Sequence, residues 1–208
     1  MGGYLTDNTF EVDLKHCLLI PKAQMINKKY AHTLCTADNF IFSIGGSYGN
    51  GPITECERYF IKENIWKSMP NLQNQRFWCA AFLFNNHLLY SLGGEQRVQL
   101  CTMEVLNVFR ITGWKNVNVL NMRNAMRACH ARQISNNEAI VFGNNSRQTY
   151  ILQIGEIIKC IDASTLSVEG HFVYCTAPVF NDENVYDIDD KERIHIYSVY
   201  EKKWSVIE

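Results

Sequence analysis

Short apolar runs that end at a glycine recur along the chain and predict β-strands. Each run is followed by one or two glycines: Phe40–Ile44 by Gly45 and Gly46, Leu88–Leu92 by Gly93 and Gly94, and Ala139–Phe142 by Gly143. Aromatic and β-branched residues are common in these segments, and clusters of Asn, Asp and Gly separate them. This alternation is typical of strands joined by tight turns. The pattern therefore predicts an all-β protein built of short antiparallel strands.

The predicted strands recur with a fixed period. The first glycines of the doublets Gly2-Gly3, Gly45-Gly46 and Gly93-Gly94, and then Gly143 of Gly143-Asn144, are separated by 43, 48 and 50 residues. Trp66 and Trp114 each lie 21 residues after the first glycine of a doublet, and Tyr59 and Tyr197 each lie seven residues before a tryptophan. Each period has room for four short strands, which is the size of one blade of a β-propeller.

The repeats assign the whole chain, 1–208, to one domain. A partial repeat at 1–25 is followed by full repeats at about 29–73, 77–123, 127–168 and 171–208. The partial repeat holds only two strands, near residues 9–14 and 17–20. We therefore expect about four full blades and an N-terminal half blade in an incomplete ring, with self-association through the open ends as a possibility.

Composition and charge narrow the class of protein. Twenty basic and 21 acidic residues give a net charge of −1, which argues against electrostatic binding of nucleic acid. No apolar run approaches the roughly 20 residues of a membrane-spanning helix. The eight cysteines form no C-x-x-C pair, and no secretory leader is recognised. We expect a cytoplasmic protein with reduced thiols and without nucleic-acid or membrane partners.

The repeat resembles that of the kelch family. The match consists of an apolar strand ending in Gly45-Gly46, a strand with Glu57 and Tyr59, and then Trp66. The resemblance covers essentially the whole chain, although the third repeat lacks its tryptophan and the fourth lacks its glycine doublet. It implies a kelch-type β-propeller whose structural motif residues are Gly45, Gly46, Tyr59, Trp66, Gly93, Gly94, Trp114, Gly143, Tyr197 and Trp204.

The resemblance also implies a function, because kelch propellers often bind proteins. The connections between repeats and the loops after the doublets are expected to share one face, and Arg and Tyr are frequent binding hot spots. The predicted partner-binding residues on that face are Tyr48, Asn50, Arg76, Glu95, Arg97, Arg123, Arg127 and Arg147. The expected role is a protein–protein interaction module, as a substrate-recognition, scaffold or cytoskeletal component.

Two alternatives remain open at this stage. The family also includes enzymes of the galactose-oxidase and sugar-isomerase kinds, and the chain could instead be a remnant of a longer kelch protein. His32 and His130 each lie thirteen residues before a glycine, where they could line a channel and hold a metal. We expect them to be structural, and we predict no catalytic residue, metal or cofactor. Gly2 fits a loose myristoylation pattern and fits a repeat doublet equally well.

Overall fold

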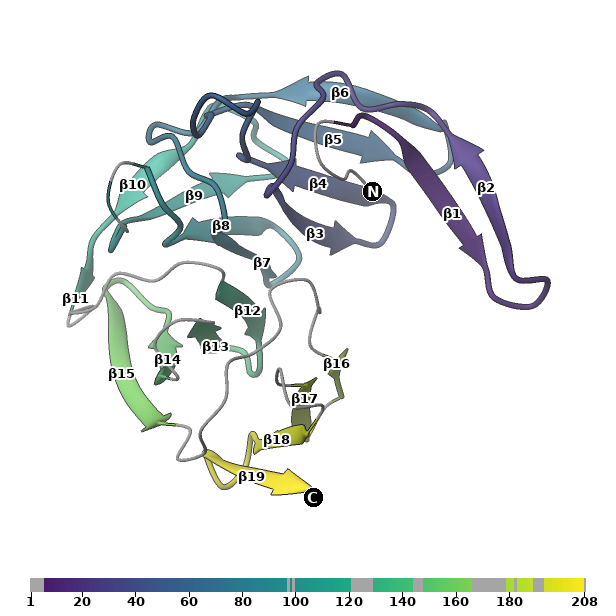
Figure 1. Ribbon diagram of the computed structural model, residues 1–208. Coiled ribbons are helices and arrows are strands. Elements are labelled where there is room, and N and C mark those ends of the chain that lie inside the picture. The colour runs from purple at the N-terminus through teal and green to yellow at the C-terminus, as the bar shows by residue number, and fades with distance from the viewer. Residues whose placement is uncertain are drawn as a thin grey trace.

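The computed structural model describes residues 6–96, 98, 100–120, 129–143, 148–165, 179–181, 183–188 and 193–207. Within these residues the regular structure consists of 19 β-strands, arranged as a series of small antiparallel sheets (Figure 1). Apart from β11, the strands of each sheet follow their order in the chain, so that neighbouring strands are consecutive in sequence. These sheets are the blades that the sequence period predicts.

The first two full blades are the most regular. Blade 1 contains β3 (Thr33–Ala37), β4 (Phe40–Ile44), β5 (Cys56–Phe60) and β6 (Ile65–Met69). Blade 2 contains β7 (Ala80–Phe84), β8 (Leu88–Leu92), β9 (Met103–Asn107) and β10 (Lys115–Val117). Both are four-stranded antiparallel sheets in which the apolar strand before each glycine doublet is the second strand. The glycines therefore lie where the second strand ends.

The remaining strands complete the series. Blade 3 contains β12 (Cys129–Gln133), β13 (Glu138–Gly143), β14 (Gln148–Gln153) and β15 (Ile158–Thr165). Blade 4 contains β16 (Val179–Phe180), β17 (Asn184–Ile188), β18 (Ile194–Ser198) and β19 (Lys203–Ile207). The N-terminal half blade is the hairpin of β1 (Thr9–Asp13) and β2 (Leu18–Lys22), which confirms the two strands expected there.

One strand departs from the expected pattern. Four strands are expected in each repeat, but after the fourth strand of blade 2, β10, ends at Val117, an additional strand, β11 (Val119–Leu120), pairs in parallel with β15. Val117 and Val119 both pack against the cluster that lies between blades 2 and 3. Packing of these half-buried side chains favours the crossing of the chain to the next blade, which gives blade 3 a fifth strand.

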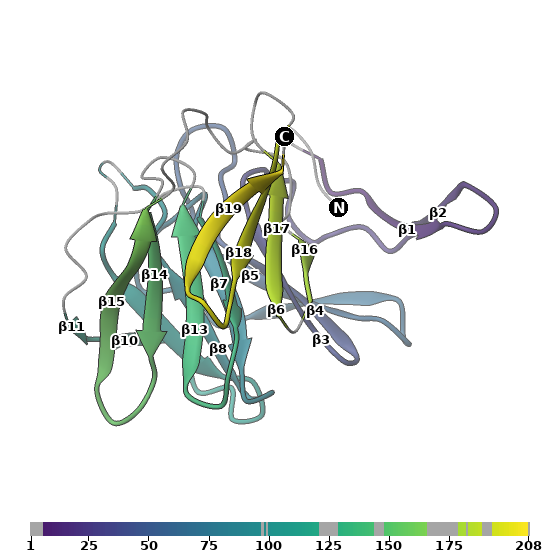
Figure 2. The same cartoon turned by 90° about the horizontal axis from the view of Figure 1, so that it is seen from below.

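The blades form an open arc. Figure 1 shows the β1–β2 hairpin at one end of the arc and the strands β16–β19 at the other, and Figure 2 shows the hairpin projecting away from the blades. The innermost strands of successive blades, β3, β7 and β12, lie next to one another around the centre. The hydrophobic core consists of the layers between consecutive blades, such as Phe42, Met69 and Trp114 between blades 1 and 2.

The repeated tryptophans of blades 1 and 4 join each of these blades to the unit before it. Tyr59 lies opposite Trp66, with ring centroids 5.1 Å apart, and Trp66 Nε1 donates a hydrogen bond of 3.1 Å to Thr9 Oγ1 of the half blade. In blade 4, Trp204 Nε1 donates one of 2.6 Å to Thr149 Oγ1 of blade 3. Thr149 lies on β14, the third strand of blade 3, and Thr9 lies on β1, which takes the place of a third strand in the half blade. The same side-chain contact therefore recurs at two steps of the arc.

Candidate functional site

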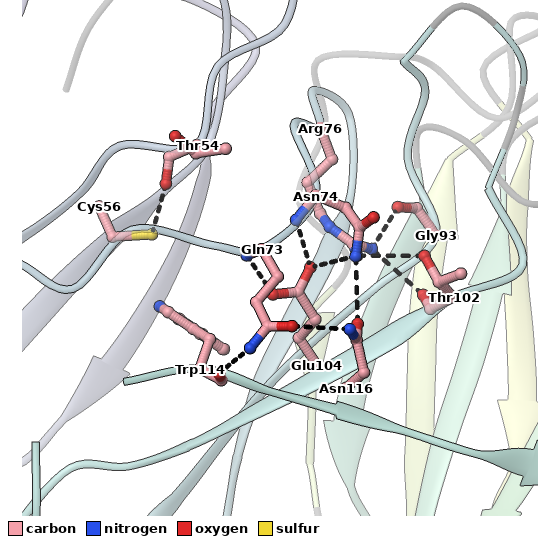
Figure 3. A network of polar contacts seen from close by, with 10 residues as sticks. All are labelled: Thr54, Cys56, Gln73, Asn74, Arg76, Gly93, Thr102, Glu104, Trp114 and Asn116. Atoms are coloured by element: carbon pink, nitrogen blue, oxygen red, sulfur yellow. Dashed lines mark hydrogen bonds and ion pairs between the residues drawn. The ribbon is translucent and has the colours of Figure 1, made fainter. Parts of the chain in front are cut away.

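Arg76 occupies the interior of the protein, which corrects the expectation that it lies on the partner-binding face. Its side chain is completely buried, and its Nη2 lies 2.7 Å from Glu104 Oε1. Its Nη1 donates hydrogen bonds to the carbonyl oxygens of Gly93 (2.8 Å) and Thr102 (3.1 Å) (Figure 3). The guanidinium is thus tied to blade 2 and is not exposed to a partner.

The carboxylate of Glu104 also binds the backbone of the connection that leads from blade 1 to blade 2. Besides Arg76 it accepts hydrogen bonds from the backbone N–H of Gln73 (2.7 Å) and from the backbone and side-chain amides of Asn74 (both 3.2 Å) (Figure 3). A buried carboxylate requires such donors, because desolvation otherwise makes its charge costly. Glu104 therefore fixes the connection between blades 1 and 2.

Blade 1 contains the same arrangement. Lys29 Nζ lies 3.4 Å from Glu57 Oε1, and both side chains are buried. Glu57 also accepts hydrogen bonds from the backbone N–H of Ile26 (2.8 Å) and from Asn27 Nδ2 (3.1 Å). Burial lowers the pKa of Lys29, against the opposing effect of the Glu57 charge. The carboxylate of the third strand thus serves as an internal anchor in two successive repeats.

A cleft of about 860 Å³ opens where the loop after the blade 1 doublet meets the connection and loop of blade 2. Tyr48 and Asn50, two of the predicted partner-binding residues, line it. Glu95 lies beside the cleft lining, is half-buried, and exchanges backbone hydrogen bonds with Phe77. Four more predicted residues, Arg97, Arg123, Arg127 and Arg147, lie outside the described residues. Of the predicted residues that the structure describes, Tyr48 and Asn50 are the two that it brings together in this cleft.

Several lining residues were not predicted from the sequence. The described lining consists of Tyr48, Asn50, Gly51, Pro52, Ile53, Thr54, Glu55, Gln75, Gln96 and Val98. Gln75 and Gln96 are exposed amides that directly precede Arg76 and Arg97, and the predicted binding set contains these arginines but not the amides. In this lining Glu55 is the one residue with a carboxylate. Burial and the neighbouring Glu55 carboxylate raise the pKa of Tyr48 to about 12, so the tyrosine is a phenol at neutral pH.

A second hollow, of about 820 Å³, lies along the innermost strands. Its wall includes Leu34 and Thr36 from β3, Ala81 and Leu83 from β7, and Ala131 from β12. The same hollow is also lined by Cys35, Asp38, Asn86, Arg132 and Gln133, so its wall combines aliphatic side chains with polar and ionisable ones. In the described parts of the chain, no cluster of His, Cys, Asp and Glu has the arrangement of a metal site.

Both candidate histidines are half-buried. His32 directly precedes β3, and His130 lies within β12 with its ring 5.7 Å from that of Phe142. Burial lowers the pKa of each histidine to about 4. Both are therefore neutral at physiological pH, and protonation of either places a charge in an apolar environment.

Mild acid is expected to destabilise the protein through these two histidines. A group whose pKa is lower in the folded than in the unfolded chain contributes full stability above its unfolded value, here 6.5, and loses it as the pH falls toward about 4. At pH 5 the loss is about 2 kcal/mol for each histidine. Urea unfolding at pH 7 and pH 5 measures it.

The double variant His32→Asn/His130→Asn is the test of this assignment, and Tyr200→Asn, at an exposed position, is its control. The double variant should lose less stability than the wild type between the two pH values, whereas the control should follow the wild type. An equal loss in all three proteins would show that other groups set the acid sensitivity.

Among the described residues no helix is long and apolar enough to cross a membrane.

The chain is similar to curated proteins named Kelch-like protein 38. The identity is 28% for the protein of Rattus norvegicus and 27% for those of Mus musculus and Homo sapiens. Each match covers 143 residues, which is 66% of this chain and 24% of the relative. The chain thus spans about a quarter of the length of these relatives. No family model matches it.

A solved structure has the same fold. The structure titled "Structure of YjhT" superposes with a TM-score of 0.79 at 11% sequence identity, and the match covers 99% of this chain and 78% of that one. At this identity the likeness concerns the fold alone. It confirms the propeller architecture that the repeats predict.

Proposed function

We propose that this chain, which carries kelch repeats and folds as a kelch-type β-propeller, is a protein-binding module that holds a segment of a partner in the cleft between blades 1 and 2. The observation that carries the proposal is the cleft itself. It lies at the loops that follow the glycine doublets, and a rigid arc of blades supports it. Loops held by such a scaffold are common binding sites.

The chemistry of the cleft supports a peptide ligand. Tyr48 supplies a large amphipathic surface, and Asn50, Gln75 and Gln96 supply amide donors and acceptors, a composition typical of surfaces that bind protein. The Glu55 carboxylate favours a segment that presents a lysine, an arginine or free backbone N–H groups. The relatives share the name Kelch-like protein, which supports a protein partner in general terms.

The proposal extends to the kind of role that the module has and to its compartment. We propose that the module acts by binding and not by catalysis, as a substrate-recognition, scaffold or cytoskeletal component in the cytoplasm. The buried free thiols of Cys35, Cys56, Cys79 and Cys160 support a reducing compartment. Burial raises the pKa of Cys35, Cys56 and Cys160 to about 12, so these thiols are poor nucleophiles.

Substitution of Tyr48 and Gln96 by alanine is expected to weaken peptide binding at least about tenfold, because a truncated tyrosine hot spot typically costs about 2 kcal/mol. Peptides are first selected with the purified chain from a displayed random library. Their affinities for the wild type and the double variant are then measured by calorimetry. Selected peptides should be rich in lysine or arginine.

Phe109→Ser, at an exposed position outside the cleft, is the matched control and should bind as the wild type does. Peptides whose affinity is unchanged in the Tyr48→Ala/Gln96→Ala variant would place the binding site elsewhere. A failure to select any peptide would overturn the proposal.

A further inference from the structure

Two basic side chains lie against one aromatic ring on blade 1. Arg58 in β5 and Lys67 in β6, the two outer strands of this blade (Figure 1), are directly opposite each other, so their side chains share one face. Arg58 Cζ lies 4.6 Å from the centroid of the Phe60 ring, and Lys67 Nζ lies 4.8 Å from it. The two positive charges therefore gather at a single ring. We call Arg58 and Lys67 the basic pair.

The guanidinium of Arg58 is held by two aromatic rings. Its Cζ also lies over the Phe40 ring at 4.9 Å, and the planes of Phe40 and Phe60 meet at 85°. Its Nε is buried without a hydrogen-bond partner. Partial burial lowers the pKa of Arg58, and among the described residues no carboxylate offsets this effect. The rings fix the guanidinium by cation–π attraction, but they leave its N–H groups without an oxygen acceptor.

The basic pair lacks a counter-charge in the described part of the chain. Neither Arg58 nor Lys67 forms an ion pair with an aspartate or a glutamate there. The buried cations Lys29 and Arg76, by contrast, each lie beside a glutamate. Like charges placed opposite each other on neighbouring strands destabilise a sheet. An anion bound between Arg58 and Lys67 would remove that repulsion and give the guanidinium an acceptor.

The fold does not require an arginine at position 58. In blade 2 the equivalent residues are Val105 and Lys115, which are opposite each other in β9 and β10 as Arg58 and Lys67 are in β5 and β6. Val105 packs against the hydrophobic cluster between blades 2 and 3. An aliphatic side chain therefore suffices at this place in a blade, and the guanidinium of blade 1 is a departure from the repeat.

We propose that the basic pair binds the phosphate group of a phosphorylated segment of a partner protein. A phosphomonoester carries a charge of about −1.5 to −2 at pH 7 and three acceptor oxygens, which suits two cations and the fork of a guanidinium. A carboxylate carries a single charge and two oxygens, so it would leave one cation of the pair uncompensated. The charge of the site thus favours a phosphate group.

A protein segment is the source of phosphate that fits the surroundings of the pair. Phe40, Phe60 and Ile65 are paired directly across β4, β5 and β6, in the row next to Arg58 and Lys67. They offer apolar contacts to the residues on either side of a phosphoserine, and inorganic phosphate has no groups that could use them. The described lining of the cleft between blades 1 and 2 includes none of these five residues. The phosphate site is therefore separate from that cleft.

An array of random-sequence peptides tests the proposal on the 208-residue chain. Each peptide is made in three versions, with phosphoserine, serine or glutamate at its centre, and those retained are titrated by fluorescence polarisation. The phosphoserine versions should bind at least about tenfold more tightly than the serine versions, because hydrogen bonds between charged groups are strong. Arg58→Val, which copies blade 2, and Lys67→Gln should each remove most of this preference. Arg58→Lys keeps the charge but loses the fork, and should weaken it.

Lys115→Gln, which removes the equivalent cation of blade 2, is the matched control and should bind as the wild type does. Tyr48→Ala/Gln96→Ala should also keep the preference, which distinguishes this site from the cleft. Circular dichroism checks the fold of each variant. Equal binding of phosphoserine and serine versions, or a preference that survives in both Arg58→Val and Lys67→Gln, would overturn the proposal. So would glutamate versions that bind as tightly as phosphoserine versions, or inorganic phosphate that binds as tightly as the peptides.

Discussion

Replacing Arg76 by methionine is expected to lower the free energy of unfolding by about 3–5 kcal/mol, the cost of breaking a buried ion pair from one side. Arg76 and Glu104 are both completely buried, and the guanidinium is the only cation in contact with this carboxylate among the described residues. Methionine fills part of the volume but leaves the Glu104 charge uncompensated in the protein interior. Urea unfolding at pH 7 followed by circular dichroism measures the loss.

Two further variants separate charge from packing. Glu104→Gln added to Arg76→Met should recover part of the loss, because a neutral amide avoids the buried charge and still accepts a hydrogen bond from Gln73. Lys29→Met should cost less than Arg76→Met, since Lys29 lies farther from Glu57, at 3.4 Å against 2.7 Å. An Arg76→Met protein within about 1 kcal/mol of the wild type would contradict the assignment.

The fold could be predicted from the sequence because its determinants are local and repeated. An apolar strand that ends at Gly45, the Tyr59–Trp66 pair and the polar turns all recur at one period, and each blade is built from consecutive strands. The crossing of the chain at β11 was missed. It depends on the burial of Val119 between blades, a contact with β15 that lies far along the sequence.

The site was predictable only in part. A lone arginine in a polar connection is normally exposed, so the sequence favoured a surface position for Arg76. Its partner Glu104 lies 28 residues away. One signal was available, because Arg76 follows Asn74 and precedes Glu104 at the same spacings at which Lys29 follows Asn27 and precedes Glu57. A charged pair kept at one spacing in two repeats indicates an internal contact.

Substitution of Gly45 by alanine is expected to destabilise the protein by about 3 kcal/mol or more. Gly45 has a φ of +59°, a left-handed conformation that costs an L-residue about 1–2 kcal/mol. An added Cβ would also lie 2.3 Å from the carbonyl oxygen of Arg76. That oxygen accepts a hydrogen bond from the N–H of Gly46, so it cannot move without loss of the contact, and overpacking adds about 1–3 kcal/mol.

Alanine substitution at three glycines separates the cost of backbone strain from the cost of the steric clash. Gly113 has a φ of +123° with open space around an added Cβ, so Gly113→Ala tests backbone strain alone and should cost about 1 kcal/mol. Gly155 has neither the strained φ nor a close neighbour, since an added Cβ would lie 3.9 Å from the nearest atom, Ile157 O, and Gly155→Ala should be near neutral. Thermal and urea unfolding of the three variants should therefore rank Gly45→Ala well below Gly113→Ala, and Gly113→Ala below Gly155→Ala. Equal losses at Gly45 and Gly113 would show that strain alone explains the doublet. The expected ranking would instead show that the first glycine of the doublet is required because the connection between blades passes directly over it.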